Sequence, residues 1–385
     1  MKNILQNSTL VLVAIMLSLV VAEIALRADG RYQDLASQLL VPSPAYWERP
    51  VNEIDFGKHP DLNVPIEIRF DRDGVRNHSE VSTREERNII GFFGDSYVEN
   101  RRIEDRFSFT SILDLAARPG ARVVNYGVDG YGLDQEYLRY KKYEHHDIHD
   151  VVYVFCENDL SNLYETGLTE MTKNGDITFR VPSINPLYRL MGRLHFTYLV
   201  ITAYYKVRML IDFLSTGNWT WKSVSFIDWL NYRERFHDQY DESITSDFLS
   251  LNPSARTTRL SEKFLVLLEK WKREVEASQR TFTVLVLPWN LDETVATKLF
   301  RDFDGNVIHS IDFFKDCENC IFQNDRHWNE YGNERIAEFI MSGGSFPFHN
   351  KFKMMNMTNL KVGIDEYYNE LPRRSRRSAT TSVPR

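Results

Sequence analysis

Two short motifs, far apart in the chain, contain the residue types that acyl transfer requires. Gly94-Asp95-Ser96 follows an apolar run and ends in a serine, and Asp325 precedes His327 by two positions near the other end of the sequence. A serine nucleophile needs a general base and a carboxylate that fixes the tautomer of that base. We therefore expect Ser96 to be the nucleophile, His327 the base and Asp325 the orienting acid. Taken singly, a turn or helix cap would explain the first motif and a surface histidine the second.

Two intervening loops offer hydrogen-bond donors for the negative charge that develops on a carbonyl oxygen. The segment from Asn125 to Gly132 is rich in glycine, which permits close approach of the backbone, and one of its glycines can donate an N–H group. Asn158 can donate from its side-chain amide, while the neighbouring Asp159 can hold the loop or cap a helix. Ordinary turns would also explain both loops, so their assignment as oxyanion donors depends on where the loops lie in the fold.

The distribution of apolar runs predicts the placement of these motifs. From Ile89 onward, short apolar runs alternate with amphipathic stretches, which predicts an α/β fold with a parallel sheet covered by helices on both faces. The expected strands are 89–93, 122–125, 150–155 and 282–287, and the expected helices are 107–116, 133–143 and 260–277. The serine, glycine and asparagine motifs each follow a strand, and the carboxyl edge of a parallel sheet is where α/β proteins bind ligands.

This order of motifs resembles the SGNH, or GDSL, hydrolase superfamily. The matched blocks are Gly94-Asp95-Ser96, Gly130, Asn158-Asp159, and Asp325 with His327, within residues 70–340. The resemblance implies a flavodoxin-like α/β/α sandwich that carries a Ser-His-Asp triad. It also implies an oxyanion hole formed by the Ser96 N–H, the Gly130 N–H and the Asn158 amide. The expected supporting residues are Asp95, Asp159 and Trp328.

The resemblance extends to a subgroup of exported or membrane-anchored bacterial SGNH proteins, in which a segment similar to residues 70–76 precedes the serine block. The chain departs from the family pattern at Cys156, where glycine is common, and in the spacing of two rather than three between the acid and the base. That shorter spacing, followed by Trp328, resembles SGNH proteins that transfer or remove O-acetyl groups on cell-surface polysaccharides.

The amino terminus is the most apolar part of the chain. Asn3 to Ala22 has no charged residue, and such a stretch can span a bilayer or serve as a cleaved signal. We expect residues 1–30 to be a membrane anchor or signal, with the rest of the chain outside the cytoplasm, in the periplasm or extracellular space. Residues 31–88 would connect it to a hydrolase domain over 89–342, with an aromatic-rich helical insertion at 161–258 and an irregular basic tail at 343–385.

The net charge and the cysteine content limit the classes of partner and cofactor that the chain can bind. A net charge of −7 gives no basic surface for nucleic acid. The spacing of Cys317 and Cys320 fits a local disulfide or two loop thiols, which we favour over a redox pair or half a zinc site because no second such pair accompanies them. No metal or organic cofactor is implied, because a triad supplies its own nucleophile and electrostatics.

The expected function is that of an exported serine carboxylesterase or O-acyltransferase acting on ester groups of a glycan, in particular O-acetyl groups. Water as acceptor would make the protein an esterase, and a sugar hydroxyl would make it a transferase. Two alternatives stay open. One is a lipase or thioesterase for longer acyl chains, and the other is a glycan-binding protein with a vestigial triad.

Overall fold

The chain divides into two compact units, Met1–Pro42 with Ser183–Gln239 and Ser43–Pro182 with Tyr240–Arg385. The computed structural model describes residues 14, 17–25, 54–62, 64–71, 73–76, 88–117, 120–166, 168–179, 242–287, 294–317, 319–343, 345–353, 355 and 357–381. In the first unit this covers helical residues 14 and 17–25, and the aromatic stretch of the expected insertion lies outside the described residues. No helix within the described ranges is both long and apolar enough to cross a membrane.

The second unit is built on a five-stranded parallel sheet with the order β4-β3-β5-β8-β9. Its strands are β3 (Ile89–Phe93), β4 (Arg122–Asn125), β5 (Ile148–Phe155), β8 (Thr281–Val286) and β9 (Asn306–His309). The predicted α/β class is thus confirmed, and the first four strands match the expected ones within two residues. The sequence did not predict β9, an edge strand. Numbered along the chain, the order is 2-1-3-4-5, consistent with a flavodoxin-like sheet.

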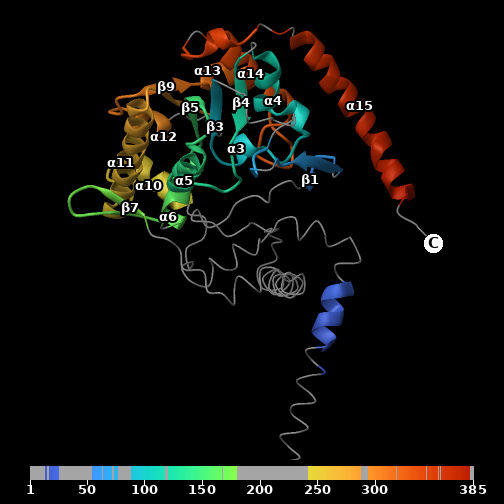
Figure 1. The fold of residues 1–385 in the computed structure, drawn as a ribbon, viewed down its shortest axis with the longest axis horizontal. Helices are drawn as coiled ribbons and strands as arrows, with labels where there is room; N and C mark the ends of the chain where they lie inside the picture. The colour runs from blue at the N-terminus through green and yellow to red at the C-terminus, as the bar shows by residue number, and fades with distance from the viewer. Residues whose placement is uncertain are drawn as a thin grey trace, which may run out of the picture. The chain divides into compact units, whose positions relative to one another are not determined.

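Successive side chains along each strand point to opposite faces of the sheet, and this alternation divides the core into two layers. In β3, Ile90 and Phe92 belong to one apolar cluster, whereas Ile89 and Phe93 belong to the other, as the period of two along a strand requires. Helices α5 (Leu133–Tyr143), α6 (Asn158–Thr166) and α11 (Ala255–Ala277) cover one face. Helices α4 (Phe109–Ala116) and α14 (Glu330–Ser342) cover the other face. Figure 1 shows the sheet between these two helical layers.

Shorter elements connect or flank these layers. Two antiparallel hairpins pair β1 (Ile54–Lys58) with β2 (Pro65–Arg69) and β6 (Thr169–Met171) with β7 (Ile177–Phe179). The short helices are α3 (Ser96–Glu99), η1 (Asp105–Phe107), α10 (Glu242–Leu249), α12 (Thr294–Leu299), α13 (Ile311–Phe314) and η2 (His349–Lys351). A longer helix, α15 (Met357–Thr381), follows them at the carboxyl end.

Part of the expected connecting segment, 31–88, is built into the second unit. Ile66, Ile68 and Phe70 are buried, and Asp61 accepts hydrogen bonds from the backbone N–H groups of Gln323 at 3.0 Å and Asn324 at 2.8 Å. These bonds attach the β1–β2 hairpin to the loop that carries Asp325 and His327. The segment therefore contributes to the domain as well as preceding it.

The expectation of an irregular tail over 343–385 is wrong for residues 357–381, which form α15. Leu360, Ile364 and Tyr367 recur at helical spacing, and Ile364 and Tyr367 are buried against Ile103 and Phe107. An amphipathic stripe stabilises a helix by packing. The arginine run farther along the tail dominated its composition and hid this stripe.

Candidate active site

Ser96 lies at the turn between a buried strand and a short helix. It is the first residue of α3, and Asp95 caps that helix by accepting a backbone N–H at 3.0 Å. Gly94 has no room for a side chain, because a Cβ there would lie 2.5 Å from Val98 Cγ2 and 3.0 Å from the Val154 carbonyl oxygen. The tight turn places Ser96 at the carboxyl edge of the sheet, beside the point between β3 and β5 where the strand order reverses.

The structure brings Ser96, His327 and Asp325 together. Ser96 Oγ lies 2.7 Å from His327 Nε2, and His327 Nδ1 contacts Asp325 Oδ1. The same carboxylate oxygen accepts the backbone N–H of His327 at 2.8 Å. An ionised carboxylate only accepts, so its contact assigns the imidazole proton to Nδ1 and leaves Nε2 to accept from the serine hydroxyl. The two-residue spacing therefore places the three groups in the order of a Ser-His-Asp relay.

Asp325 is held in its charged form. Burial opposes ionisation, but the hydrogen bond from His327 and the charge of Arg102 outweigh it and keep the pKa of the Asp325 carboxyl below its ordinary value. An ionised carboxylate at Nδ1 stabilises the imidazolium that forms when a base takes a proton at Nε2. The electrostatics of the pair thus suit general-base catalysis.

Aromatic packing fixes the loop behind the imidazole. The Tyr97 ring lies 4.9 Å from the His327 ring, and its hydroxyl donates to the Arg326 carbonyl oxygen at 2.7 Å. Trp328 is 1% exposed and packs between Tyr97 and Phe314, with ring centroids 5.2 Å and 5.0 Å away. Trp328 therefore supports the triad loop by filling the core beneath it.

The expected oxyanion donors differ in how they are tied to the serine. Asn158, at the start of α6, donates from Nδ2 to Asp95 Oδ2 at 2.9 Å. Since the amide carries a second N–H, this contact orients the group and leaves one donor available. Gly130 has φ of +79°, the region that favours glycine. It is tied to the triad indirectly, through its neighbour Asp129.

Asp159 is fully buried and holds the loop after β5. Its Oδ2 accepts the Cys156 N–H at 2.9 Å and the Tyr153 hydroxyl at 2.8 Å. Burial raises the pKa of the Asp159 carboxyl, and the nearby Asp95 adds to the shift. Burial also raises the pKa of the Cys156 thiol, which packs in the core. The departure from glycine at this position therefore places a neutral, buried side chain in the loop.

Sequence reasoning missed Arg102. Its Nε donates to Asp325 Oδ2 at 2.9 Å, and its Nη1 lies 3.6 Å from Asp129 Oδ2. No motif marks this arginine, because its role depends on three loops that meet only in the fold. Tyr97 was missed too, although its position directly after the serine could have indicated it.

A pocket of about 350 Å³ opens beside the triad. Its lining is mixed, with polar groups and backbone from the triad loop next to two aromatic rings and one aliphatic side chain. The lining residues are Tyr97, Ile321, Phe322, Gln323, Asn324, Asp325 and Arg326. Of the triad residues, Asp325 lines this pocket and Ser96 and His327 do not, so the pocket adjoins the acid side of the triad.

Cys317 and Cys320 form a disulfide in the segment that leads into the triad loop. Within the described ranges, no three His, Cys, Asp or Glu side chains are grouped as ligands for a metal ion. Comparison of the chain with protein-family models and with curated proteins finds no match.

Proposed function

We propose that this protein is an exported serine esterase or O-acyltransferase of the SGNH type that acts on ester groups of a glycan, O-acetyl groups in particular. One observation carries the proposal: the unbroken series of contacts from Ser96 Oγ through His327 to Asp325 at the carboxyl edge of the sheet. The order of the sheet and the family resemblance of the motifs support it. The disulfide near the triad supports an oxidising compartment.

The proposed reaction has two acyl-transfer steps. Ser96 Oγ attacks the ester carbonyl carbon while His327 Nε2 takes the hydroxyl proton. The oxyanion accepts hydrogen bonds from the backbone N–H groups of Ser96 and Gly130 and from the Asn158 amide. When the tetrahedral intermediate collapses, the bond to the alcohol breaks and His327 returns the proton to that alcohol. Water or a sugar hydroxyl then repeats the sequence on the acyl-enzyme and releases Ser96.

Exposed polar side chains beside Asp325 support a polar carrier, such as a sugar, for the ester group. Three side chains of the pocket, Gln323, Asn324 and Arg326, are exposed and can form hydrogen bonds to sugar hydroxyls. A lipase or thioesterase would need a long apolar trough next to Ser96. Assays with and without a sugar acceptor distinguish water from a sugar hydroxyl as the acyl acceptor.

The test is hydrolysis of p-nitrophenyl acetate together with labelling by a fluorophosphonate probe. We expect the wild type to react with both and Ser96→Ala and His327→Ala to lose at least about 1,000-fold in rate. Ser261→Ala is the matched control, because Ser261 is a half-buried serine on α11 whose hydroxyl donates to the Thr258 carbonyl oxygen of its own helix. Folded wild type that neither hydrolyses the ester nor takes up the probe would contradict the proposal and favour a binding protein with a vestigial triad.

A further inference from the structure

Arg102 contacts the acid of the triad from the side opposite the histidine. Asp325 uses Oδ1 for His327 and Oδ2 for Arg102 Nε, at 2.9 Å. A carboxylate held at both oxygens cannot turn away from the imidazole without losing a charge-assisted bond. The Arg102 side chain is 20% exposed, so the contact is partly shielded from water.

The same segment of chain holds the glycine loop. Arg102 Nη1 lies 3.6 Å from the Asp129 carboxylate, and Glu99 Oε2 accepts the Asp129 backbone N–H at 2.6 Å. Asp129 immediately precedes Gly130, the expected oxyanion donor. Both the side chain and the backbone of Asp129 are therefore fixed by residues 99–102.

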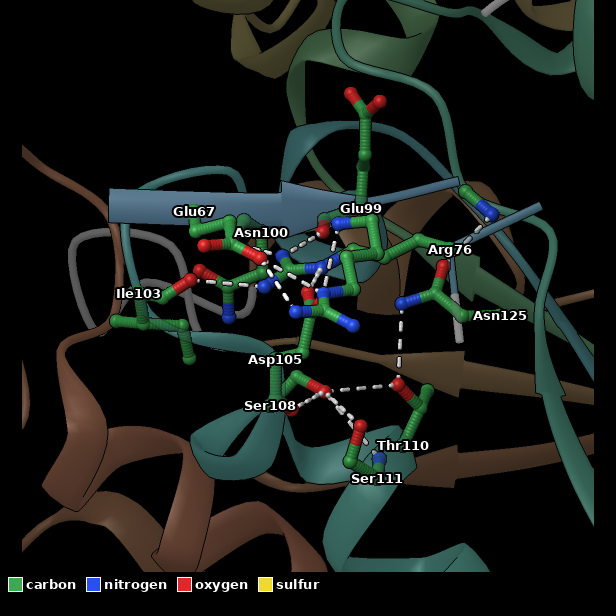
Figure 2. Close-up of polar contacts among 12 residues, drawn as sticks. Glu67, Arg76, Glu99, Asn100, Ile103, Asp105, Ser108, Thr110, Ser111 and Asn125 are labelled. Carbon is green, nitrogen blue, oxygen red and sulfur yellow. Dashed lines mark hydrogen bonds and ion pairs between the residues drawn. The ribbon is translucent and has the colours of Figure 1, made fainter. Parts of the chain in front are cut away.

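That segment is itself anchored by a buried arginine. Arg76 Nη1 donates to the carbonyl oxygens of Glu99 and Asn100, and Nη2 donates to that of Ile103 at 2.8 Å. Arg76 Nε completes the arrangement with a 2.6 Å bond to Asp105 Oδ1. Figure 2 shows the Arg76 guanidinium among these groups. The backbone that presents Arg102 is thus held at three carbonyl groups.

We infer that Arg102 is a positioning residue that sets the distance between the Asp325–His327 pair and the Gly130 loop. The inference rests on the proposed function and deepens it. Arg102 touches neither the serine nor the pocket-lining segment other than Asp325, so it acts through the two carboxylates. Its planar, forked guanidinium presents Nε to Asp325 and Nη1 to Asp129, a geometry that the compact charge of a lysine ammonium does not reproduce.

The test measures kcat, KM and the pH profile of ester hydrolysis for Arg102→Gln and Arg102→Lys. We expect the glutamine variant to lose up to about 100-fold in kcat with little change in KM, because displaced catalytic groups slow the chemistry more than binding. The lysine variant should also lose kcat, since its ammonium group does not reproduce the two-armed geometry of the guanidinium. Arg106→Gln is the matched control: Arg106 follows shortly after Arg102 in the chain, but its side chain is 47% exposed and pairs with Glu104, so the kcat of this variant should equal that of the wild type.

The pH profile separates positioning from a purely structural role. Loss of the Arg102 positive charge beside the triad should move the acidic limb of kcat/KM to higher pH in Arg102→Gln. In Arg102→Lys the charge remains, and the limb should stay close to its wild-type position. The charged and titratable groups around this pair are Asp95, Tyr97, Asp129 and Asp325, none of which is changed in these variants.

An Arg102→Gln protein that is folded by circular dichroism and keeps both the wild-type kcat and the wild-type acidic limb would overturn the inference. If that variant does not fold, Arg102→Lys decides, because an unchanged kcat there would overturn the inference equally. Failure of the proposed function is recognised separately, since the wild type itself would then neither hydrolyse the ester nor bind the fluorophosphonate probe.

Discussion

Arg76 is a charged residue with a side chain only 1% exposed, paired with Asp105 at 9% exposure. A buried charge is tolerated only where hydrogen bonds replace the water that it loses. Arg76 meets this condition with the Asp105 carboxylate and three backbone carbonyl groups. Arg76 ends the segment 70–76, which resembles a segment of the exported SGNH subgroup. Its contacts show what this segment does here: Arg76 supports the loop after α3.

Replacing Arg76 by methionine should therefore destabilise the fold. The change leaves Asp105 buried without its partner, which typically costs about 3–5 kcal/mol. Urea unfolding of wild type and Arg76→Met measures the difference. Arg69→Met is the control, because the Arg69–Glu67 pair is 65% and 45% exposed and exposed pairs contribute about 0–1 kcal/mol. Equal losses of unfolding free energy in the two variants would mean that the Arg76–Asp105 pair contributes no more to stability than an exposed ion pair does.

Glu136 is the opposite case, a buried carboxyl without hydrogen bonds at either oxygen among the described residues. Burial, followed by the charges of Asp159 and Asp95, raises the pKa of Glu136 well above its ordinary value. The folded state thus keeps the proton longer than the unfolded state does. The free energy of unfolding should fall as pH rises from the ordinary value of 4.5 towards the raised pKa.

Glu136→Gln should make this fall smaller, because glutamine mimics the protonated acid and does not titrate, while Asp159 and Asp95, whose pKa values are also raised, still contribute to it. We expect the variant to match the wild type near pH 4.5 and to become the more stable of the two at higher pH. Urea unfolding at a series of pH values provides the measurement. Glu276→Gln, at an exposed side chain paired with Lys272, should follow the wild-type curve throughout. A wild-type stability that does not fall with pH would contradict the shift.

At the scale of elements, α15 is attached to the domain by one apolar face. Ile364 is fully buried there, while Val362, two residues earlier, is 49% exposed. Ile364→Ala should cost about 2–5 kcal/mol, since it removes packed methyl groups and leaves a cavity. Val362→Ala should change stability by less than about 0.5 kcal/mol. Thermal unfolding of both variants tests whether the helix is packed in solution, and a small effect at both positions would mean that it is not.

Elements with a strong apolar pattern were predictable, and those with a weak one were not. The first four strands of the sheet and α5 were expected at nearly their observed bounds because each presents a clear apolar run or stripe. Strand β9 has only one buried residue, Ile308, and an edge strand of this kind gives little periodic signal. Strand β1 was not predicted, because prolines interrupt the segment in which it lies.

In the candidate site, residues with a distinctive chemical type were predictable, and residues that matter only through their contacts were not. Ser96, Asp325 and His327 were selected from residue type, since few side chains can serve a serine nucleophile. Arg102 and Glu99 could not be selected, because charged residues in loops are common and only tertiary contacts distinguish these two. Sequence patterns therefore indicate the reacting groups, while the residues that hold them in place depend on which loops meet in space.

At the scale of the whole molecule, the parallel order of the sheet brings the strand-end loops to one edge. The loop after β3 carries Ser96, and the loops after β4 and β5 carry Gly130 and Asn158. Parallel strands are joined by crossover helices rather than tight turns, so each of these groups comes from a separate part of the chain.

The triad contact joins positions 231 residues apart, and this separation has a consequence for biosynthesis. A ribosome completes Ser96 long before His327, so a partly made chain contains the serine but no base to activate it. The hydroxyl gains its partner only when the loop that carries His327, just before α14, has been synthesised and has folded. Under the proposed function, an incomplete chain would therefore be inert towards esters until the segment that carries His327 has been made and folded.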